Sequence, residues 1–217
     1  MAGRERFFNA QPPAATWLGG LIVAAHVARW AAPEDVKIQF ADALAVIPIR
    51  YEEGVSLANL AAIFGHVFLH ANWIHLGFNM ALFFAVSGAV ARRLGAAGGQ
   101  TWRFLALFFL SAAGSAACYI AINRGSGVGA VGASGAVCGL FAAYLMGARW
   151  DWRASLRDKW VLQTGFAFLA VNVGLAFVAR MLGVLPIAWE AHLGGFVAGA
   201  VAFPFLAPRF AKADADV

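Results

Sequence analysis

Charged side chains are scarce in this chain, and their scarcity excludes an ordinary soluble fold. Of its 217 residues, 12% are Asp, Glu, Lys or Arg and 62% are hydrophobic. A typical soluble domain carries about 25% charged and about 45–50% apolar residues. Segments of alternating polar and apolar residues, which barrel strands need, are also lacking. We therefore predict an all-α integral membrane protein.

Cysteines are few as well, and acidic residues are missing from the apolar runs. Cys118 and Cys138 both fall in apolar runs, so a disulfide framework is not indicated. The net charge is +5, but no basic domain or recognition motif accompanies it, and we expect no nucleic-acid partner. No carboxylate falls inside a predicted span, so acidic ligands for a metal are missing. We expect neither a metal nor another cofactor.

The sequence does contain long apolar runs, close to the ~20 residues that a membrane-spanning helix needs. Six spans are predicted, at residues 15–32, 73–90, 104–122, 134–148, 162–178 and 191–206. They form a membrane domain over 15–208, between an N-terminal segment, 1–14, and a tail, 209–217. The first span lacks a clear cleavage site, which argues against a signal peptide. The apolar stretch 56–69 follows a polar loop and is predicted to lie at the membrane interface.

Basic residues set the predicted orientation, because they concentrate in cytoplasmic loops. On this rule both termini are cytoplasmic and the loop 33–70 is external. Eleven of the 16 Lys and Arg then lie on the cytoplasmic side: Arg4, Arg6, Arg92, Arg93, Arg103, Arg149, Arg153, Arg157, Lys159, Arg209 and Lys212.

Unusual polar residues lie near the external starts of three of these spans. His70 and His75 lie near the start of the second span, Ser134 starts the fourth, and His192 starts the sixth. Polar and ionisable groups in a membrane are functional candidates because their burial is unfavourable. A serine and an imidazole are the minimum parts of an acyl-transfer site.

Small residues explain how Ser134 and His192 could meet. Gly135 and Gly139 follow the serine, and Gly195 and Gly199 follow the histidine, each pair in a small-xxx-small pattern. Such faces let two helices approach closely in lipid. Packing through these faces would bring Ser134 and His192 within hydrogen-bond reach. The alternative is that these are ordinary packing glycines of membrane helices.

Donors for a developing oxyanion are also present. His75 and Asn79 are four residues apart, hence on one helix face, and the Ser134 N–H lies at a helix start. Glu190, two residues before His192, points away from it on a helix. We therefore predict a Ser–His dyad whose base is oriented by packing rather than by an acid.

Two further histidines are interpreted as packed or hydrogen-bonded core residues. His66 lies four residues before His70, and His26 lies alone in the first span. His75 would lie opposite His66 on a continuous helix, so a three-histidine metal site is not expected.

Three motifs together resemble those of rhomboid intramembrane serine proteases. His70-Ala-Asn-Trp-Ile-His75-Leu-Gly-Phe-Asn79 is similar to HxxxxHxxxN, Gly132-Ala-Ser134-Gly135 to GxSG, and Ala191-His192-Leu-Gly-Gly195-Phe-Val-Ala-Gly199 to AHxxGxxxG. They occur in the right order and spacing over residues 57–205. The joint pattern is specific, although GxSG alone is weak.

The resemblance implies that Ser134 is the nucleophile and His192 the general base. It implies an oxyanion hole of His75, Asn79 and the Ser134 amide, with His70 supporting the site and its hydration. The implied fold is the six-helix bacterial rhomboid core in a bacterial inner membrane, with the first external loop partly embedded. The implied substrates are transmembrane segments of other proteins, cut without a cofactor.

Two departures and two alternatives accompany the resemblance. Cys138 stands where many bacterial relatives carry an aromatic residue that stacks on the catalytic histidine, and the Trp-Arg pair that some relatives carry in the first loop is absent. Arg50 is a partial substitute for that pair.

The first alternative is an inactive relative that binds client transmembrane segments, although it would usually have lost Ser134 or His192. The second is a small transporter or metal-binding protein, although no inverted repeat is detectable.

Overall fold

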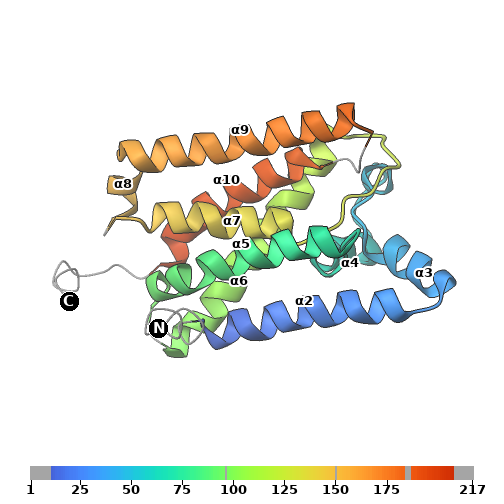
Figure 1. Ribbon diagram of the computed structural model, residues 1–217, viewed down its shortest axis with the longest axis horizontal. Coiled ribbons are helices and arrows are strands. Elements are labelled where there is room, and N and C mark those ends of the chain that lie inside the picture. Colours follow the sequence, from blue (N-terminus) through green and yellow to red (C-terminus); the bar gives the residue numbers. More distant parts are fainter. Residues whose placement is uncertain (1–10, 96, 150, 184–186, 208–217) are drawn as a thin grey trace.

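The computed structural model describes residues 11–95, 97–149, 151–183 and 187–207, and within them it is a helical bundle (Figure 1). The predicted tail, 209–217, and residues 1–10 of the predicted N-terminal segment lie outside these ranges. The helices are α2 Pro13–Ala31, α3 Glu34–Leu44, η1 Pro48–Tyr51, α4 Leu57–Gly65, η2 His66–Phe68, α5 Trp73–Arg93, α6 Ala97–Ile122, α7 Ser134–Met146, α8 Trp152–Ser155, α9 Lys159–Met181 and α10 Trp189–Leu206.

The predicted all-α class is confirmed, and each of the six predicted spans coincides with a helix: α2, α5, α6, α7, α9 and α10. Three segments are long and apolar enough to cross a membrane: Trp73–Arg93, Gly99–Ile122 and Lys159–Met181. Helix α7 has only 13 residues. At 1.5 Å per residue it is about 20 Å long, which is shorter than the ~30 Å hydrocarbon layer.

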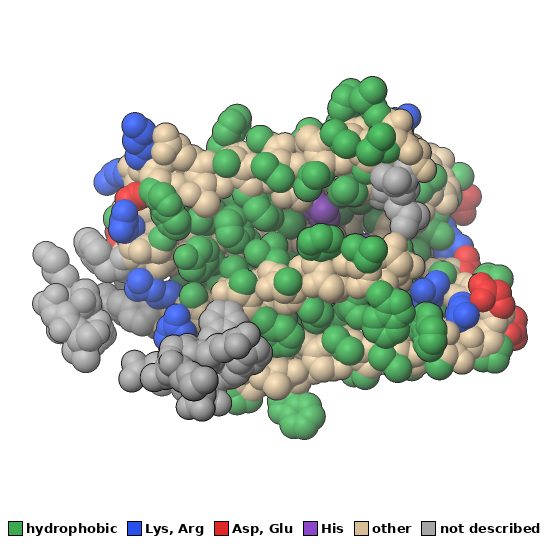
Figure 2. Space-filling model, in the orientation of Figure 1, with side chains coloured by type: hydrophobic (Ala, Val, Ile, Leu, Met, Phe, Trp, Pro, Cys, Tyr) green, Lys and Arg blue, Asp and Glu red, His purple; other side chains and the backbone are tan. Residues whose placement is uncertain are grey.

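The surface of the bundle is typical of a multi-pass membrane protein. Figure 2 shows hydrophobic side chains over the middle of one face, while charged side chains gather at the two ends. Large apolar side chains lie exposed on the surface of several helices. Trp17, Phe78, Phe166 and Phe205 are each at least 75% exposed. In water such a surface would be unfavourable, whereas lipid chains cover it without cost.

Helix α7 is the central element. Ten of its residues are buried, and it packs against α5, α6 and α10. Helix α9 lies on the outside of the bundle. Its buried residues are Val161, Gly165, Ala176 and Ala179. The starts of α5, α7 and α10 lie at the same end of the bundle (Figure 1), as the sequence predicted.

Glycine seams join α10 to its two main neighbours, α6 and α7. A Cβ at Gly195 would overlap the carbonyl of Gly135, and one at Gly199 would overlap the backbone of Gly139. The predicted packing through the two small-residue faces is therefore confirmed. On the other side of α10, a Cβ at Gly194 would overlap the backbone of Gly114 in α6.

Side-chain caps define where several helices begin. Asn72 accepts a hydrogen bond from the His75 N–H at 2.8 Å, which confirms it as the N-cap of α5. Asp158 accepts from the Val161 N–H at 3.0 Å at the start of α9. The Asp158 carboxylate also pairs with Arg149, and this hydrogen bond lowers the pKa of the carboxyl. Cap and ion pair together fix the connection between α8 and α9.

The first loop, 33–70, is more helical than the sequence indicated. Helix α3 was not predicted, because it lies in the loop between two predicted spans and is too short to be a span; none of its residues is buried. It begins after Pro33, and the carboxylates of Glu34 and Asp35 in its first turn interact favourably with the helix dipole. The stretch 56–69, which the sequence predicts to lie at the membrane interface, forms α4 and η2, and α4 starts with Ser56 as N-cap.

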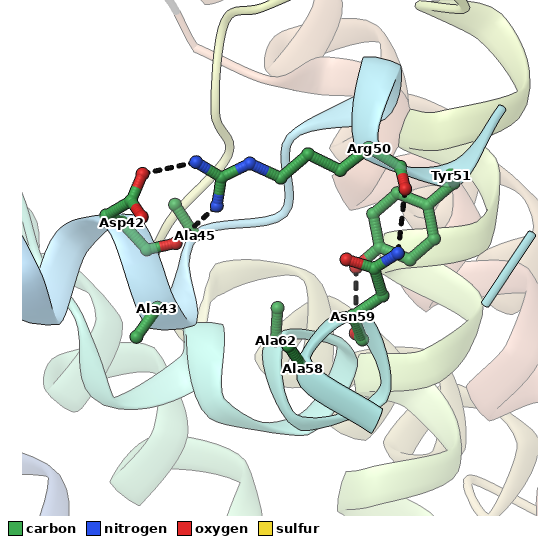
Figure 3. A pocket seen from close by; sticks show the side chains of 8 residues that line it. All are labelled: Asp42, Ala43, Ala45, Arg50, Tyr51, Ala58, Asn59 and Ala62. Carbon is green, nitrogen blue, oxygen red and sulfur yellow. Dashed lines mark hydrogen bonds and ion pairs between the residues drawn. The ribbon is translucent and has the colours of Figure 1, made fainter. Parts of the chain in front are cut away.

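A small pocket of about 110 Å³ lies inside this loop (Figure 3). Arg50 closes one side by pairing with Asp42 of α3, and its carbonyl accepts from Asn59 Nδ2 at 2.7 Å. The Tyr51 hydroxyl donates to the Asn59 carbonyl at 2.9 Å. These contacts are all within the loop, so Arg50 holds α3, η1 and α4 together.

Candidate active site

Ser134 is the first residue of α7, and Gly132, two residues before it, lies where any side chain would be strained. Gly132 has φ +121°, a conformation that side chains disfavour. A Cβ there would come within 2.7 Å of His75 Cε1 and 2.9 Å of His75 Nε2, and would lie 3.7 Å from Ser134 Oγ. The His75 ring and the Ser134 hydroxyl therefore face the same small space.

The start of α7 has no side-chain cap, because its N-cap residue is Ala133. Within the described ranges, the Ser134 N–H makes no hydrogen bond outside its own helix. Amides at a helix start carry the positive end of the helix dipole and bind negative charge. The Ser134 N–H is therefore free to donate to an anion, and its predicted role in an oxyanion hole stays a prediction.

His70 supports the residue just before the nucleophile. Its ring is 1% exposed, and His70 Nε2 accepts from the Ala133 N–H at 3.4 Å. The ring centroid of His75 lies 5.2 Å from that of His70, and the centroid of His26 lies 6.1 Å away on the side of α2. His26 itself packs edge-on against Trp73 at 4.5 Å.

No group of three His, Cys, Asp or Glu placed to hold a metal ion occurs in the part of the chain that the structure describes. His66 is buried, and its Nδ1 lies 3.2 Å from the Ala62 carbonyl. His26 and His66 are thus the packed residues that the sequence suggested.

Asn79 lies one helical turn after His75 and is 5% exposed. Its Nδ2 is a buried donor for which the described residues supply no acceptor. Leaving such a donor unpaired costs about 1–3 kcal/mol. Asn79 thus carries a buried, unpaired amide donor one helical turn from His75, as an oxyanion hole requires before substrate binds, and its role as such a donor stays a prediction.

Four backbone hydrogen bonds tie the loop before Ser134 to the first loop, one of them from the Ile49 N–H to the Ser126 carbonyl at 3.0 Å. Val46 and Ala130 exchange hydrogen bonds of 3.0 and 2.9 Å in an isolated antiparallel bridge. Gly132 N–H donates to the His66 carbonyl at 2.9 Å. The first loop, although distant in sequence, therefore sets the position of the nucleophile.

His192 lies in the first turn of α10, next to the start of α7. A Cβ at Gly135 would lie 3.0 Å from the Ala191 carbonyl, so the residue after Ser134 meets the residue before His192. No hydrogen bond joins Ser134 Oγ to His192 within the described ranges. Catalytic hydrogen bonds are often long before substrate binds. The predicted closeness of the two helices is confirmed, and the predicted Ser–His bond stays a prediction.

The partner of His192 is a residue that the sequence analysis missed. His192 Nδ1 lies 2.7 Å from Asn172 Oδ1, in α9. We expected packing alone to orient this ring, and the structure adds a polar contact from a third helix. The signal in the sequence was a single amide in the middle of an apolar span, with no motif around it.

Cys138, which stands where many relatives carry an aromatic residue, is 3% exposed within α7 and offers no ring that could stack on His192. Aromatic packing beside α10 comes instead from α9. Phe168 lies 6.0 Å from Phe196 and 4.3 Å from Phe141, measured between ring centroids. This cluster holds α9 against α7 and α10 one helical turn below the His192–Asn172 contact.

Comparison with known proteins matches residues 57–209 to the rhomboid domain. The chain is also similar to a rhomboid-type serine protease 2 of Emericella nidulans, with 28% identity over 134 residues. That match covers 61% of this chain and 24% of the relative, so the chain spans about a quarter of the relative's length.

Proposed function

The chain belongs to the rhomboid family, and from this premise we propose that it is an intramembrane serine endopeptidase. It hydrolyses peptide bonds in or near transmembrane segments of other membrane proteins. One observation carries the proposal. The His75 ring and the Ser134 hydroxyl face one small space at the uncapped start of α7, and α10, which carries His192, packs against that start.

In the proposed mechanism, Ser134 Oγ attacks the scissile carbonyl, and His192 Nε2 accepts the hydroxyl proton. The resulting oxyanion accepts hydrogen bonds from His75, Asn79 Nδ2 and the Ser134 N–H. The protonated His192 then gives its proton to the leaving amine. Water, deprotonated by His192, hydrolyses the acyl-enzyme and regenerates Ser134.

The proposed membrane placement uses α2, α5, α6, α7, α9 and α10 as the six spans. Because α7 is only about 20 Å long, its start would lie about 10 Å below one membrane surface when its other end reaches the opposite one. Water must therefore reach Ser134 from that surface. The first loop, with α3 and α4, lies at the same end of the bundle (Figure 1).

We propose that substrates reach the site from the lipid between α5 and α9. Among the described helices α9 packs mainly on α10 and α7, and Figure 2 shows a histidine side chain at the surface of this face of the bundle. A transmembrane segment could place an unwound end there without leaving the bilayer. Substrate access between α5 and α9 is part of the proposal.

Labelling with a fluorophosphonate tests the function directly. We expect the detergent-solubilised protein to form one covalent adduct, mapped to Ser134 by mass spectrometry. The adduct should be absent in Ser134→Ala and strongly reduced in His192→Ala. A relative that only binds client helices would remain unlabelled, and an adduct on another serine would contradict the assignment.

Asn79→Ala is expected to lower kcat by a factor of about 10²–10³, because loss of one oxyanion donor costs ~2.7–4 kcal/mol of transition-state stabilisation. KM should change little. Steady-state cleavage of a fluorescent single-pass substrate in vesicles measures both constants. Ser87→Ala is the matched control, since this buried serine of α5 bonds only the Phe83 carbonyl of its own helix, at 2.6 Å. A change in KM alone would make Asn79 a substrate contact.

The proposed topology places both termini in the cytoplasm of a bacterial inner membrane and the loop 33–55 outside. In a cysteine-free background, Glu53→Cys should react with an impermeant maleimide in intact cells. Arg153→Cys should react only after the cells are opened. The reverse pattern would put the active site at the cytoplasmic face.

A further inference from the structure

Asn172 lies in the middle of α9, on the outside of the bundle, and its side chain contacts the His192 ring of α10. Its Nδ2 donates to the Phe168 carbonyl one turn earlier, at 2.8 Å, and its Oδ1 lies 2.7 Å from His192 Nδ1. In the described part of α9 and α10, this is the one hydrogen bond that joins the two helices.

The chemistry of the two contacts fixes where the protons lie. A backbone carbonyl only accepts, so the Phe168 contact requires the NH₂ end of the amide. The other end, Oδ1, also only accepts, and His192 Nδ1 must therefore carry the hydrogen of the 2.7 Å contact. A neutral imidazole has one N–H, so its Nε2 is left with a free lone pair.

We infer that Asn172 is a positioning residue that holds His192 in the Nδ1–H tautomer, with Nε2 free to accept the proton of Ser134. The inference rests on the proposed function and deepens it. No carboxylate contacts His192 within the described ranges, so the amide takes the orienting role that an acid has in a Ser-His-Asp triad. Where such an acid is replaced with the geometry intact, the wrong tautomer alone lowers kcat by about 10⁴.

The experiment compares four variants with the wild-type protein. Asn172→Ala and Asn172→Leu remove the acceptor, and Asn172→Asp keeps an acceptor of the same shape. Asn123→Ala is the matched control, because Asn123 Nδ2 also donates to the carbonyl four residues earlier, at 3.1 Å, but contacts no histidine. Thermal stability is measured for each variant.

Two readouts are taken: kcat and KM for a single-pass substrate, and the ¹⁵N ring shifts of histidine-labelled protein, with His192 assigned by difference from His192→Ala. In Asn172→Ala and Asn172→Leu we expect kcat to fall about 10²-fold at unchanged KM, the lower end of what a positioned general base contributes. The His192 signal should shift toward the Nε2–H tautomer. Asn172→Asp should restore the Nδ1–H signal and most of kcat.

Unchanged ring shifts in Asn172→Ala would overturn the inference, whether or not the rate falls, since a rate loss alone would show a structural role. A rate loss equally large in Asn123→Ala would overturn it too. The ring shifts report the tautomer without any turnover. If the wild-type protein forms no adduct at Ser134, the proposed function fails, while the shifts still decide whether Asn172 sets the tautomer.

Discussion

Replacing Ser134 with alanine is expected to abolish cleavage of a transmembrane substrate while leaving the bundle folded. The Ser134 side chain caps no helix, since Ala133 is the N-cap residue of α7, and it makes no hydrogen bond within the described ranges. Its loss therefore removes the nucleophile and little else. In a serine protease of another fold, loss of the serine lowers kcat by about 10⁶, which here means turnover below background.

The measurement is release of a fluorescent fragment from a single-pass substrate reconstituted with the protein in vesicles. Ser87→Ala, the same substitution at a buried site in α5, should keep the wild-type rate. Thermal unfolding in detergent checks that both variants fold. Turnover of Ser134→Ala close to the wild-type rate would rule out the serine mechanism.

Gly195→Ala is expected to unfold or grossly destabilise the bundle. The added Cβ would overlap the backbone carbonyl of Gly135, which, unlike a flexible side chain, cannot turn away. Helices α7 and α10 would have to separate, and overpacking of this kind costs about 1–3 kcal/mol or more. Because Ser134 and His192 flank this contact, fluorophosphonate labelling should be lost with stability.

Gly174→Ala is the matched control. It makes the same change in a helix, but a Cβ at Gly174 meets nothing within 4 Å. Alanine is favoured over glycine inside a helix by about 0.5–1 kcal/mol, so this variant should be as stable as the wild type or slightly more so. The midpoint of thermal unfolding distinguishes the two variants. An unchanged midpoint in Gly195→Ala would show that the two helices tolerate separation.

The sequence was most informative where composition and spacing act directly. Apolar runs located all six long helices, because burial in lipid requires continuous apolar length. The small-residue patterns at 135–139 and 195–199 predicted which faces of α7 and α10 meet, because only glycine permits that approach. The sequence also predicted that His75, Ser134 and His192 lie at the same end of the bundle, because the second, fourth and sixth spans all start on the same side of the membrane.

The sequence was least informative where a single tertiary contact decides the outcome. Helix α3 has no buried residue and only 11 residues, so it was not found by a search for membrane-length apolar runs. Asn172 is one amide in an apolar helix, and only the packing of α9 against α10 gives it a partner. The sequence analysis considered Arg50 as a partial substitute for the Trp-Arg pair that some relatives carry in the first loop. The structure shows Arg50 pairing with Asp42 inside that loop.

The place of α10 in the chain has a consequence for biosynthesis. It is the last helix that the structure describes, yet it fills the space beside α6 and α7 and carries His192. During translation Ser134 emerges well before its proposed base and before the glycine seams that fix the start of α7. On the proposed mechanism, a nascent or prematurely terminated chain that ends before residue 189 lacks the base, so we expect no cleavage of neighbouring proteins until α10 has been made and inserted.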